Sequence, residues 1–592
     1  MTIQESRPQA LTAEATLGTA LRHPEARALL ENRLPELRDT ATKMILGGRA
    51  LGLVLSTSPA LNGDADAAQS LLTELAQLAP HRDGRPARST RPTPSPNYES
   101  PSIERGSAPV GHPDRVSLHR RFELTLEGPS HGNPFVDVRL RATIETPQGP
   151  VDVPGFYDGD GTYRIRYLSR HLGEHRIRTE SNARSLDGVE VAFLVDPAAP
   201  EDHGPVRVER EFHFAYEDGT RYLPIGTTAY AWTHQGEELE SRTLETLAAS
   251  PFTKLRMCVF PKSYLFNENE PERFPFVGDL ASGFDVHRFD PAYWRHLERR
   301  IEDLQRLGIE ADLILFHPYD RWGFSTMDSE TDDAYLHYAV ARLASLPNVW
   351  WSLANEYDLM PDKTTRDWER FAAIVQSDDP AGHLLSIHNC YAFYDHGRPW
   401  VTHASLQRQD LYKTSEMTTE WRQQWGKPVV IDECAYEGDI DQGWGNITGE
   451  EMVRRFWEGA VRGGYVGHGE TYLRPDDVIW WAKGGELRGT SPSRIAFLRR
   501  ILEDAPRGIE PLSIDWDIPS LGIEGEYYLF YYGFTQPRFR RFVWDPAVTY
   551  EVDLIDTWNM TIETLPGEFR GRFTIDLPGR PYQALRFRAG GR

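Results

Sequence analysis

The chain has 592 residues and a formal net charge of −23, with 65 Lys and Arg against 88 Asp and Glu. This length suits about four domains of ~150 residues, or fewer if one of them is a large α/β barrel. The acidic balance repels phosphate backbones and anionic lipid surfaces, so neither nucleic acid nor a membrane is an expected partner. Aromatic residues make up 11% of the chain, which suits either a carbohydrate site or an aromatic-rich core.

The cysteines and the amino-terminal segment indicate where the protein works. Cys258, Cys390 and Cys434 form neither a CxxC pair nor a Cys/His metal pattern, so we expect no disulfide framework, no metal site and no cofactor. The first residues lack a basic start followed by an apolar run, and no stretch of about 18 apolar residues occurs. We therefore expect a cytoplasmic protein.

Two segments precede the informative part of the chain. Residues 1–80 place Leu and Ala at helical spacing and predict a helical module, a candidate assembly element for a homo-oligomer. Residues 81–115 are rich in Pro, Ser, Arg and Gly, a composition typical of a linker.

Two further segments alternate apolar and polar residues with a period of two. Residues 116–206 contain FELTLEG, YRIRYLS and VEVAFLVD, which predict an antiparallel β-sandwich. Residues 505–592 contain YYLFYYGF, FRRFVW and TYEVDLIDTW, which predict a second antiparallel β-domain.

Between them, residues 207–504 alternate apolar strand candidates with amphipathic helices. Eight strand-plus-helix units over about 300 residues are the count of a (β/α)8 TIM barrel, and we assign the chain to the α/β class. A doubly wound open sheet is the alternative, but no GxGxxG follows an early strand. The strand candidates are 222–230, 252–261, 309–318, 348–358, 383–390, 400–407, 428–438 and 464–472.

Polar side chains gather at the carboxyl ends of these strands, where the active site of a barrel lies. The substrate-binding candidates are Arg256, Trp232, His234, His317, Asn355, His388, Asn389, His403, Glu437, Glu470 and Trp480. Tyr230, Tyr319, Gln407, His468 and Tyr472 are further polar residues at strand ends. Each tryptophan is as well explained by core packing as by stacking on a sugar.

Glu356 and Glu433 stand out because they end the fourth and seventh strand candidates, which lie across the mouth of a barrel from each other. Glycoside hydrolysis needs one carboxyl group to protonate the departing oxygen and another to attack or to activate water. We therefore predict these two glutamates as the catalytic pair.

Three short sequences carry a family resemblance. NVWWSLANEYD and KPVVIDECAYEG resemble the fourth- and seventh-strand signatures of clan A glycoside hydrolases, and Arg256 in FTKLRMCVF resembles the second-strand Arg of that clan. The segment PGFYDGDGTY of the expected sandwich is a further match, and residues 116–590 as a whole resemble the apiosidase-like group. The resemblance implies that Glu356 is the acid/base, Glu433 the nucleophile, Asn355 a ligand of the sugar 2-hydroxyl and Arg256 the cation beside the nucleophile.

The leading hypothesis is therefore a retaining, exo-acting glycoside hydrolase that cleaves an oligosaccharide or glycoside by double displacement. The resemblance makes a pentofuranoside the first substrate to consider. Glu437 is a rival nucleophile. Two other functions stay open: a catalytically silent carbohydrate-binding barrel, and a metal-dependent hydrolase that uses His317, His388 and His403.

Overall fold

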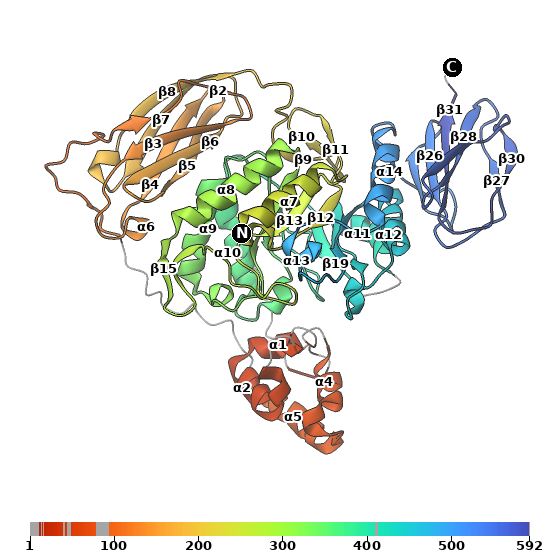
Figure 1. Ribbon diagram of the computed structural model, residues 1–592, viewed down its shortest axis with the longest axis horizontal. Coiled ribbons are helices and arrows are strands. Elements are labelled where there is room, and N and C mark those ends of the chain that lie inside the picture. Colours follow the sequence, from red (N-terminus) through yellow and green to blue (C-terminus); the bar gives the residue numbers. More distant parts are fainter. Residues whose placement is uncertain are drawn as a thin grey trace.

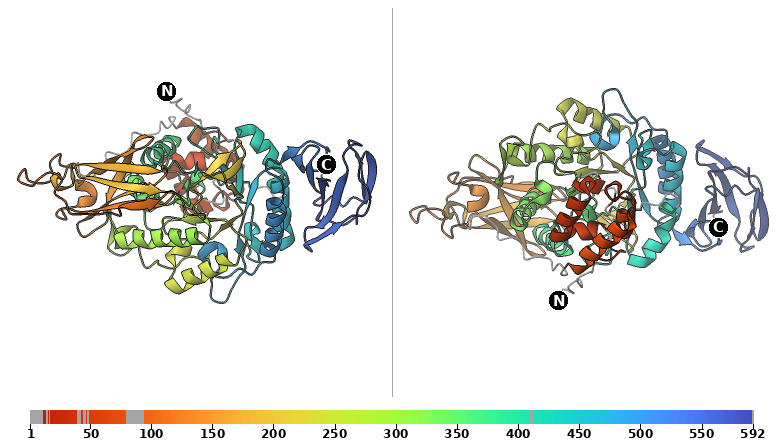
Figure 2. Two further views of the ribbon diagram at one scale, coloured as in Figure 1. Left: turned by 90° about the horizontal axis from the view of Figure 1, so that it is seen from above. Right: turned by 90° about the horizontal axis from the view of Figure 1, so that it is seen from below.

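A computed structural model describes residues 94–408 and 413–590, together with residues 11–78 except 14, 16, 39–41, 44–45 and 47–48. A central barrel lies between two β-domains, and a small helical module packs below it (Figure 1). The views from above and from below place the two β-domains on opposite sides of the barrel (Figure 2). This arrangement confirms the expected fold: an α/β barrel with a β-domain before it, a β-domain after it and an extra helical module.

The helical module buries the leucines whose spacing predicted it, among them Leu30, Leu51 and Leu71. A side-chain cap fixes the start of its last helix, because Asp64 accepts hydrogen bonds from the N–H groups of residues 66 and 67. Arg27 forms an ion pair of 3.1 Å with Asp362 of the barrel. The elements are α1 (Leu17–Arg22), α2 (Pro24–Arg33), η1 (Pro35–Arg38), α4 (Leu51–Thr57), η2 (Pro59–Leu61) and α5 (Ala65–Gln77).

The expected linker differs from the structure in its second half. Residues 81–93 lie outside the described residues, but residues 94–115 run along the sandwich. The N–H of Tyr98 donates to the carbonyl of Asn182 at 3.0 Å, and the Glu99 carboxylate accepts from the N–H of Ser185 at 2.6 Å. Hydrogen bonds to the backbone thus order a segment that has few apolar side chains to bury.

The amino-terminal β-domain is an eight-stranded sheet that folds over on itself, in the order β1-β3-β6-β5-β4-β7-β8-β2. Strand β5 passes from one layer to the other, since residues 149–154 pair with β4 and residues 155–157 with β6. The crossing point of β5 is at Gly155, where a Cβ would lie 2.6 Å from side-chain atoms of both Ile165 and Leu140, so a larger residue would not fit without a shift. The strands are β1 (Val110–Gly111), β2 (Arg115–Ser117), β3 (Arg121–Glu127), β4 (Leu140–Thr146), β5 (Gly149–Tyr157), β6 (Thr162–Leu168), β7 (Gly173–Ser181) and β8 (Glu190–Asp196), with α6 (Pro134–Asp137) and η3 (Arg184–Leu186) between them.

Eight parallel strands form the barrel, in the order β18-β17-β16-β13-β12-β22-β20-β19, so each expected strand is present and has the expected neighbours. The N–H of Thr402 donates to the carbonyl of Leu385 at 2.9 Å, which joins the first and last strands of that order. In chain order the strands are β12 (Gly226–Thr228), β13 (Lys254–Cys258), β16 (Glu310–Phe316), β17 (Val349–Ala354), β18 (Leu385–Ser386), β19 (Ala404–Gln407), β20 (Val429–Glu433) and β22 (Tyr465–His468).

Helices surround the barrel, with one exception to the expected eight repeats. The connection from β18 to β19, residues 387–403, is described throughout and contains no helix. Its sequence, with Gly397, Pro399 and several aromatic residues, lacks a helical apolar stripe. The helices are α7 (Glu237–Ala248), α8 (Pro291–Arg306), α9 (Ser329–Leu343), α10 (Thr365–Asp378), α11 (Thr418–Trp425), α12 (Gly449–Val461), α13 (Trp480–Lys483) and α14 (Ser491–Glu503), with short turns η4 (Trp232–His234), η5 (Phe324–Thr326), η6 (Tyr357–Leu359), η7 (Ser415–Met417) and η8 (Gly443–Gly445).

Small strands add to both ends of the barrel. Phe214 of a three-stranded sheet contacts Trp350 and Tyr465, which lie near the amino ends of β17 and β22, so this sheet covers the end opposite the predicted site. The additional strands are β9 (Val206–Glu209), β10 (His213–Tyr216), β11 (Arg221–Tyr222), β14 (Phe276–Asp279), β15 (Gly283–Phe289), β21 (Glu437–Gly438) and β23 (Glu470–Thr471).

The carboxyl-terminal domain consists of antiparallel strands with an aromatic core that includes Phe530, Phe542 and Phe587. It packs against the barrel through apolar contacts, for example between the rings of Trp457 on α12 and Tyr531. The strands are β24 (Glu510–Leu512), β25 (Ser520–Ile523), β26 (Tyr527–Tyr531), β27 (Phe539–Val543), β28 (Tyr550–Asp556), β29 (Thr561–Thr564), β30 (Arg572–Asp576) and β31 (Gln583–Ala589). None of the helices in the described part of the chain combines the length and apolarity needed to cross a bilayer.

A buried carboxylate fastens the amino-terminal β-domain to the barrel. Asp158, in the turn between β5 and β6, is 1% exposed and bonds Arg342 of α9 at 2.7 Å and Arg164 of β6 at 2.8 Å. Burial alone would raise the pKa of Asp158, but the Arg342 and Arg164 guanidinium groups outweigh it and hold the pKa below its usual value. The charged form of Asp158 therefore stabilises the contact between the two domains.

We predict that Asp158→Asn destabilises the folded protein, because it removes one of the two carboxylates that pair with Arg342 and with Arg164 and leaves them only Glu298 and Glu123, at a cost of up to about 3–5 kcal/mol. Thermal and urea unfolding followed by fluorescence measure the effect at pH 7. Because the pKa of Asp158 is lowered on folding, its contribution is present at neutral pH and disappears as the pH falls through that lowered pKa.

The matched control is Asp160→Asn in the same turn, since Asp160 is exposed and has a φ of 50°, which asparagine tolerates well. Equal stability of both variants would contradict the assignment of Asp158 as the fastening residue.

Candidate active site

Glu356 lies just beyond the carboxyl end of β17 in a turn with unusual backbone geometry. Its φ and ψ are both 53°, the left-handed region that non-glycine residues seldom adopt. The turn is held by its neighbours, since the N–H of Tyr357 donates to the carbonyl of His388 at 2.9 Å and the N–H of His388 donates to Ala354 at 3.0 Å. Strained geometry of this kind is common where a side chain must be aimed at a ligand.

The Glu356 carboxyl group is buried, with 5% of the residue exposed, and is held by two polar side chains. The hydroxyl of Tyr319 donates to Oε2, and Nε2 of Gln407 donates to Oε1 at 2.7 Å. Burial, followed by the nearby charge of Glu433, raises the pKa of Glu356 to about 7. Near neutral pH this group can therefore give up or accept a proton.

Glu433 is the last residue of β20 and remains partly exposed. The hydroxyl of Tyr230, two residues beyond β12, donates to its Oε1 and also lies 3.4 Å from Oδ1 of Asn355. Tyr230 thus connects the ends of three strands, and it brings Glu433 into the same group as the Asn355–Glu356 turn.

Arg256 contacts Asn355 rather than Glu433 directly. Its Nη2 donates to Oδ1 of Asn355 at 3.1 Å, and its Nη1 to Ser352 at 3.3 Å and to Asp312 at 3.2 Å. The positive charge of Arg256 still acts on Glu433 through space. Its most direct effect is to orient the Asn355 amide.

Below these residues, a layer of buried charges fills the barrel: Lys254 and Arg256 with Asp312 and Asp432, each no more than 2% exposed. Nζ of Lys254 contacts both aspartates, with 2.7 Å to Asp432. Burial would raise the pKa of Asp432, but Lys254 and Arg256 hold it well below its usual value. Asp432 therefore points into this layer, whereas its neighbour Glu433 belongs to the mouth of the barrel.

Lys262 is a site residue that the sequence analysis did not identify. It follows β13 by four residues and is 3% exposed, with its Nζ 3.5 Å from the ring centre of Tyr230, 4.2 Å from that of Tyr319 and 4.6 Å from that of Trp481. Its position after the second strand was the only available signal, because its neighbours in FPKSY resemble an ordinary loop.

Three candidates beside the first and third strands have their polar atoms bound within the protein. Trp232 is completely buried and its Nε1 donates to Sδ of Met257 at 3.3 Å. Nε2 of His234 lies 3.0 Å from the hydroxyl of Tyr293, and Nε2 of His317 lies 3.2 Å from the carbonyl of Phe260. Burial lowers the pKa of both histidines to about 3, so neither is charged near neutral pH.

The substrate-binding candidates of the fifth and sixth strands lie in different parts of the barrel. Asn389 supports the site, since its Nδ2 donates to the carbonyl of Gln407 at 3.0 Å. His388 is completely buried after β18. His403 precedes β19, and Gln407 at the carboxyl end is four residue steps, about 13 Å, farther along the strand. It contacts Trp350 and Phe214 near the opposite end of the barrel instead of lining the mouth.

The histidines of the metal-dependent alternative do not converge. Among the described residues, two groups bring three possible ligand atoms within 4.8 Å of one another, and neither contains His317, His388 or His403. One group is Glu237, Glu240 and His296; the other is Glu437, His468 and Glu470.

Glu437 and Glu470 hold the start of α14. Glu437 accepts from the N–H of Thr490 at 2.7 Å, and Glu470 accepts from the N–H of Gly489 at 2.7 Å. Carboxylates at a helix amino terminus are stabilised by the unpaired N–H groups there, which explains their position without a bound ion. Burial raises the pKa of Glu470 to about 7.

The adjacent tryptophans of α13 have different surroundings. Trp480 is 2% exposed, and its Nε1 donates to Thr227 at 3.0 Å inside the barrel wall. Trp481 contacts Tyr230 and Tyr436, in the aromatic group around Lys262. Of the two tryptophans, only Trp481 is therefore next to Tyr230, whose hydroxyl donates to Glu433.

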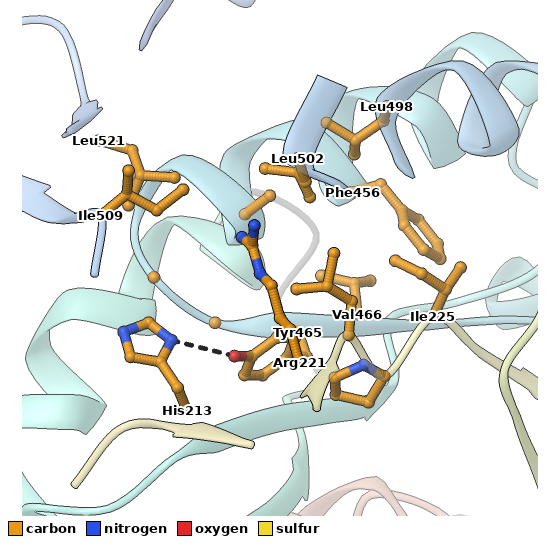
Figure 3. A pocket seen from close by; sticks show the side chains of 15 residues that line it. His213, Arg221, Ile225, Phe456, Tyr465, Val466, Leu498, Leu502, Ile509 and Leu521 are labelled. Atoms are coloured by element: carbon orange, nitrogen blue, oxygen red, sulfur yellow. Dashed lines mark hydrogen bonds between the residues drawn. The ribbon is translucent and has the colours of Figure 1, made fainter. Parts of the chain in front are cut away.

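The pocket in Figure 3 is separate from the carboxylates. Its volume is about 50 Å³, and it is lined by apolar side chains such as Ile225 and Leu498, with a hydrogen bond of 3.1 Å between Nδ1 of His213 and the hydroxyl of Tyr465. Ile225 and Tyr465 lie at the amino ends of β12 and β22, opposite the site, while Leu498 belongs to α14 and His213 to β10. A second cavity, of about 570 Å³, lies between the amino-terminal β-domain and α9.

Three sequence families match successive parts of the chain. The family described as apiosidase-like, catalytic domain, matches residues 209–493, which include the whole barrel site. Two domains of unknown function match the flanking β-domains, DUF5060 at residues 115–182 and DUF5605 at residues 516–588. A comparison with curated proteins found no match.

Solved structures resemble the chain as well. A candidate glycoside hydrolase of Bacteroides vulgatus ATCC 8482 is 39% identical, with a TM-score of 0.77; the match covers 81% of this chain and all of that one. A family 5 glycoside hydrolase of the same organism, with 16% identity and a TM-score of 0.53, matches 66% of this chain and 94% of its own. A further glycoside hydrolase, with 15% identity and a TM-score of 0.52, matches 66% and 98%. At this low identity the last two support the fold alone.

Proposed function

The chain belongs to the apiosidase-like family of barrel glycoside hydrolases, and on that premise we propose that it is a retaining enzyme with Glu433 as nucleophile and Glu356 as acid/base. The observation that carries the proposal is the pair of carboxyl groups at the ends of β17 and β20, joined through Tyr230 and Asn355. Their unequal surroundings favour different protonation states, which the two roles require.

In the first step, the Glu356 carboxyl group gives its proton to the glycosidic oxygen while a Glu433 oxygen attacks the anomeric carbon. The bond to the departing alcohol breaks, and an ester to Glu433 forms. In the second step, the Glu356 carboxylate takes a proton from water, the water oxygen attacks the anomeric carbon, and the ester bond breaks. Glu356 regains its proton and Glu433 its charge.

The surrounding residues support this assignment. A pKa of about 7 leaves Glu356 protonated in a large part of the molecules at neutral pH, as a general acid requires. The Tyr230 hydroxyl donates to Glu433 and stabilises its charged form. Asn355, held by Arg256, is available to bind the sugar 2-hydroxyl.

The proposal includes the kind of substrate and the mode of cleavage. The family description supports a pentofuranoside as the sugar that is released. The burial of Glu356 favours exo action, because a pocket encloses a terminal sugar more completely than an open cleft encloses an internal one. Pentofuranosides and hexosides of both anomeric forms, as aryl glycosides and as short oligosaccharides, are the substrates to compare.

We predict that Glu433→Ala and Glu356→Ala each lower kcat by about 10³-fold or more on a substrate that the native enzyme cleaves. Azide should restore turnover, with inverted product from Glu433→Ala and retained product from Glu356→Ala, because only the second variant still forms the glycosyl-enzyme. NMR of the glycosyl azide measures the configuration.

Glu486→Ala is the matched control, since Glu486 is an exposed glutamate that forms an ion pair with Arg474. Near-native turnover in both site variants would refute the assignment, and glycan binding without any release of sugar would favour the silent barrel.

The pH dependence separates the two glutamates. Tyr319→Phe removes a hydrogen bond that lowers the pKa of Glu356, so the alkaline limb of kcat/KM, near pH 7 in the native enzyme, should move to higher pH. Tyr230→Phe removes the donor to Glu433 and leaves the Tyr319 hydrogen bond to Glu356 in place, so it should lower kcat while the alkaline limb stays close to its native position. An alkaline limb that moves to lower pH in Tyr319→Phe would contradict the role of Glu356.

A further inference from the structure

The ammonium group of Lys262 is enclosed by aromatic rings from different elements. Tyr230 follows β12, Tyr319 follows β16, Trp481 belongs to α13, and Tyr264 of the same loop is 5.9 Å away. Ring faces attract a cation but do not neutralise its charge. Within the described residues, Lys262 forms no ion pair, in contrast to Lys254 in the layer below.

Two of these rings belong to the tyrosines that hold the glutamates. Tyr230 donates to Glu433, and Tyr319 donates to Glu356, while both rings lie within 4.2 Å of Lys262 Nζ. The ammonium therefore lies between two tyrosine–glutamate arms that come from opposite sides of the barrel. Both carboxylates act on it electrostatically.

The other ionisable groups that face Lys262 leave the two glutamates as its counter-charges. Burial raises the pKa of the Cys258 thiol to about 12, so that group is neutral. The charge of Arg256 is opposed by Asp312 and Asp432. The hydroxyls of Tyr230, Tyr319 and Tyr264 have raised pKa values and are neutral, and burial lowers the pKa of His317 to about 3, so this histidine is neutral as well.

We propose that Lys262 is a positioning residue whose ammonium is the shared counter-charge of Glu356 and Glu433 through both steps of the reaction. The proposal rests on the double displacement proposed above. In the free enzyme Glu433 is charged and Glu356 protonated; in the glycosyl-enzyme Glu433 is an ester and Glu356 is charged. The pair thus carries one negative charge in each resting state, and one fixed cation balances it in both.

The first test is the pH profile of kcat/KM. In Lys262→Met, the loss of the positive charge should raise the pKa of Glu356 and move the alkaline limb to higher pH by about one unit or more. Lys262→Arg keeps the charge and should restore an alkaline limb close to the native one. Lys483→Met, which removes the charge of a lysine on α13 that is paired with Asp477, should leave the alkaline limb in place. Lower activity with an unshifted alkaline limb in Lys262→Met would overturn the proposal.

The second test needs no turnover. Lysine occurs at only seven positions, 43, 254, 262, 363, 413, 427 and 483, so 13C-labelled lysine gives a spectrum simple enough to titrate. The signal that Lys262→Arg abolishes should titrate near pH 8, below a free lysine, because burial lowers its pKa to about 8. In Glu433→Gln, the midpoint should fall by about one unit, since one counter-charge is gone.

An unchanged midpoint in Glu433→Gln would overturn the proposal whether or not the protein cleaves glycosides. A shifted midpoint in a protein that cleaves no glycoside would instead refute the proposed function and leave the electrostatic coupling established.

Discussion

The buried charge layer of Lys254, Arg256, Asp312 and Asp432 is the interaction on which the site depends. Two cations and two carboxylates are costly to remove from water, and they are tolerated inside the barrel because they pair with one another. Three strands, β13, β16 and β20, supply these residues, so the layer ties those strands together at one level of the barrel. Arg256 extends from it to Asn355, so the position of the Asn355 amide depends on this layer.

Above the layer, the two glutamates are held by neutral donors, the hydroxyls of two tyrosines. Tyr230 donates a hydrogen bond to Glu433 and Tyr319 donates one to Glu356, and neither adds positive charge. The left-handed turn at Glu356 points that side chain toward Tyr319 and Gln407. Positive charge comes from Lys262, which contacts the faces of both tyrosine rings, and from Arg256, which acts on Glu433 through space.

Sequence patterns predicted the parts of this molecule that depend on local physics. Eight apolar runs identified the barrel strands, since parallel strands buried on both faces consist largely of apolar residues. Strand ends also predicted that Glu356 and Glu433 lie at the mouth of the barrel. The helix expected after β18 is absent, because residues 387–403 lack a helical apolar stripe. His403 lies at the amino end of its strand, because the boundaries of short strands depend on pairing rather than on composition alone. Lys262 had no periodic signal, and the aromatic excess lies largely in cores.

By itself, the sequence determined the order of the domains, the parallel barrel and the two carboxylates at its mouth, because hydrophobic periodicity and strand order are properties of neighbouring residues. The tertiary structure decided which groups surround those carboxylates. Tyr230, Lys262 and Tyr319 come from three separate connections and Gln407 from the end of β19, and only closure of the barrel brings them within hydrogen-bonding or ring-contact distance. Burial and charge at close range then set the pKa of Glu356, and neither exists until the chain is folded.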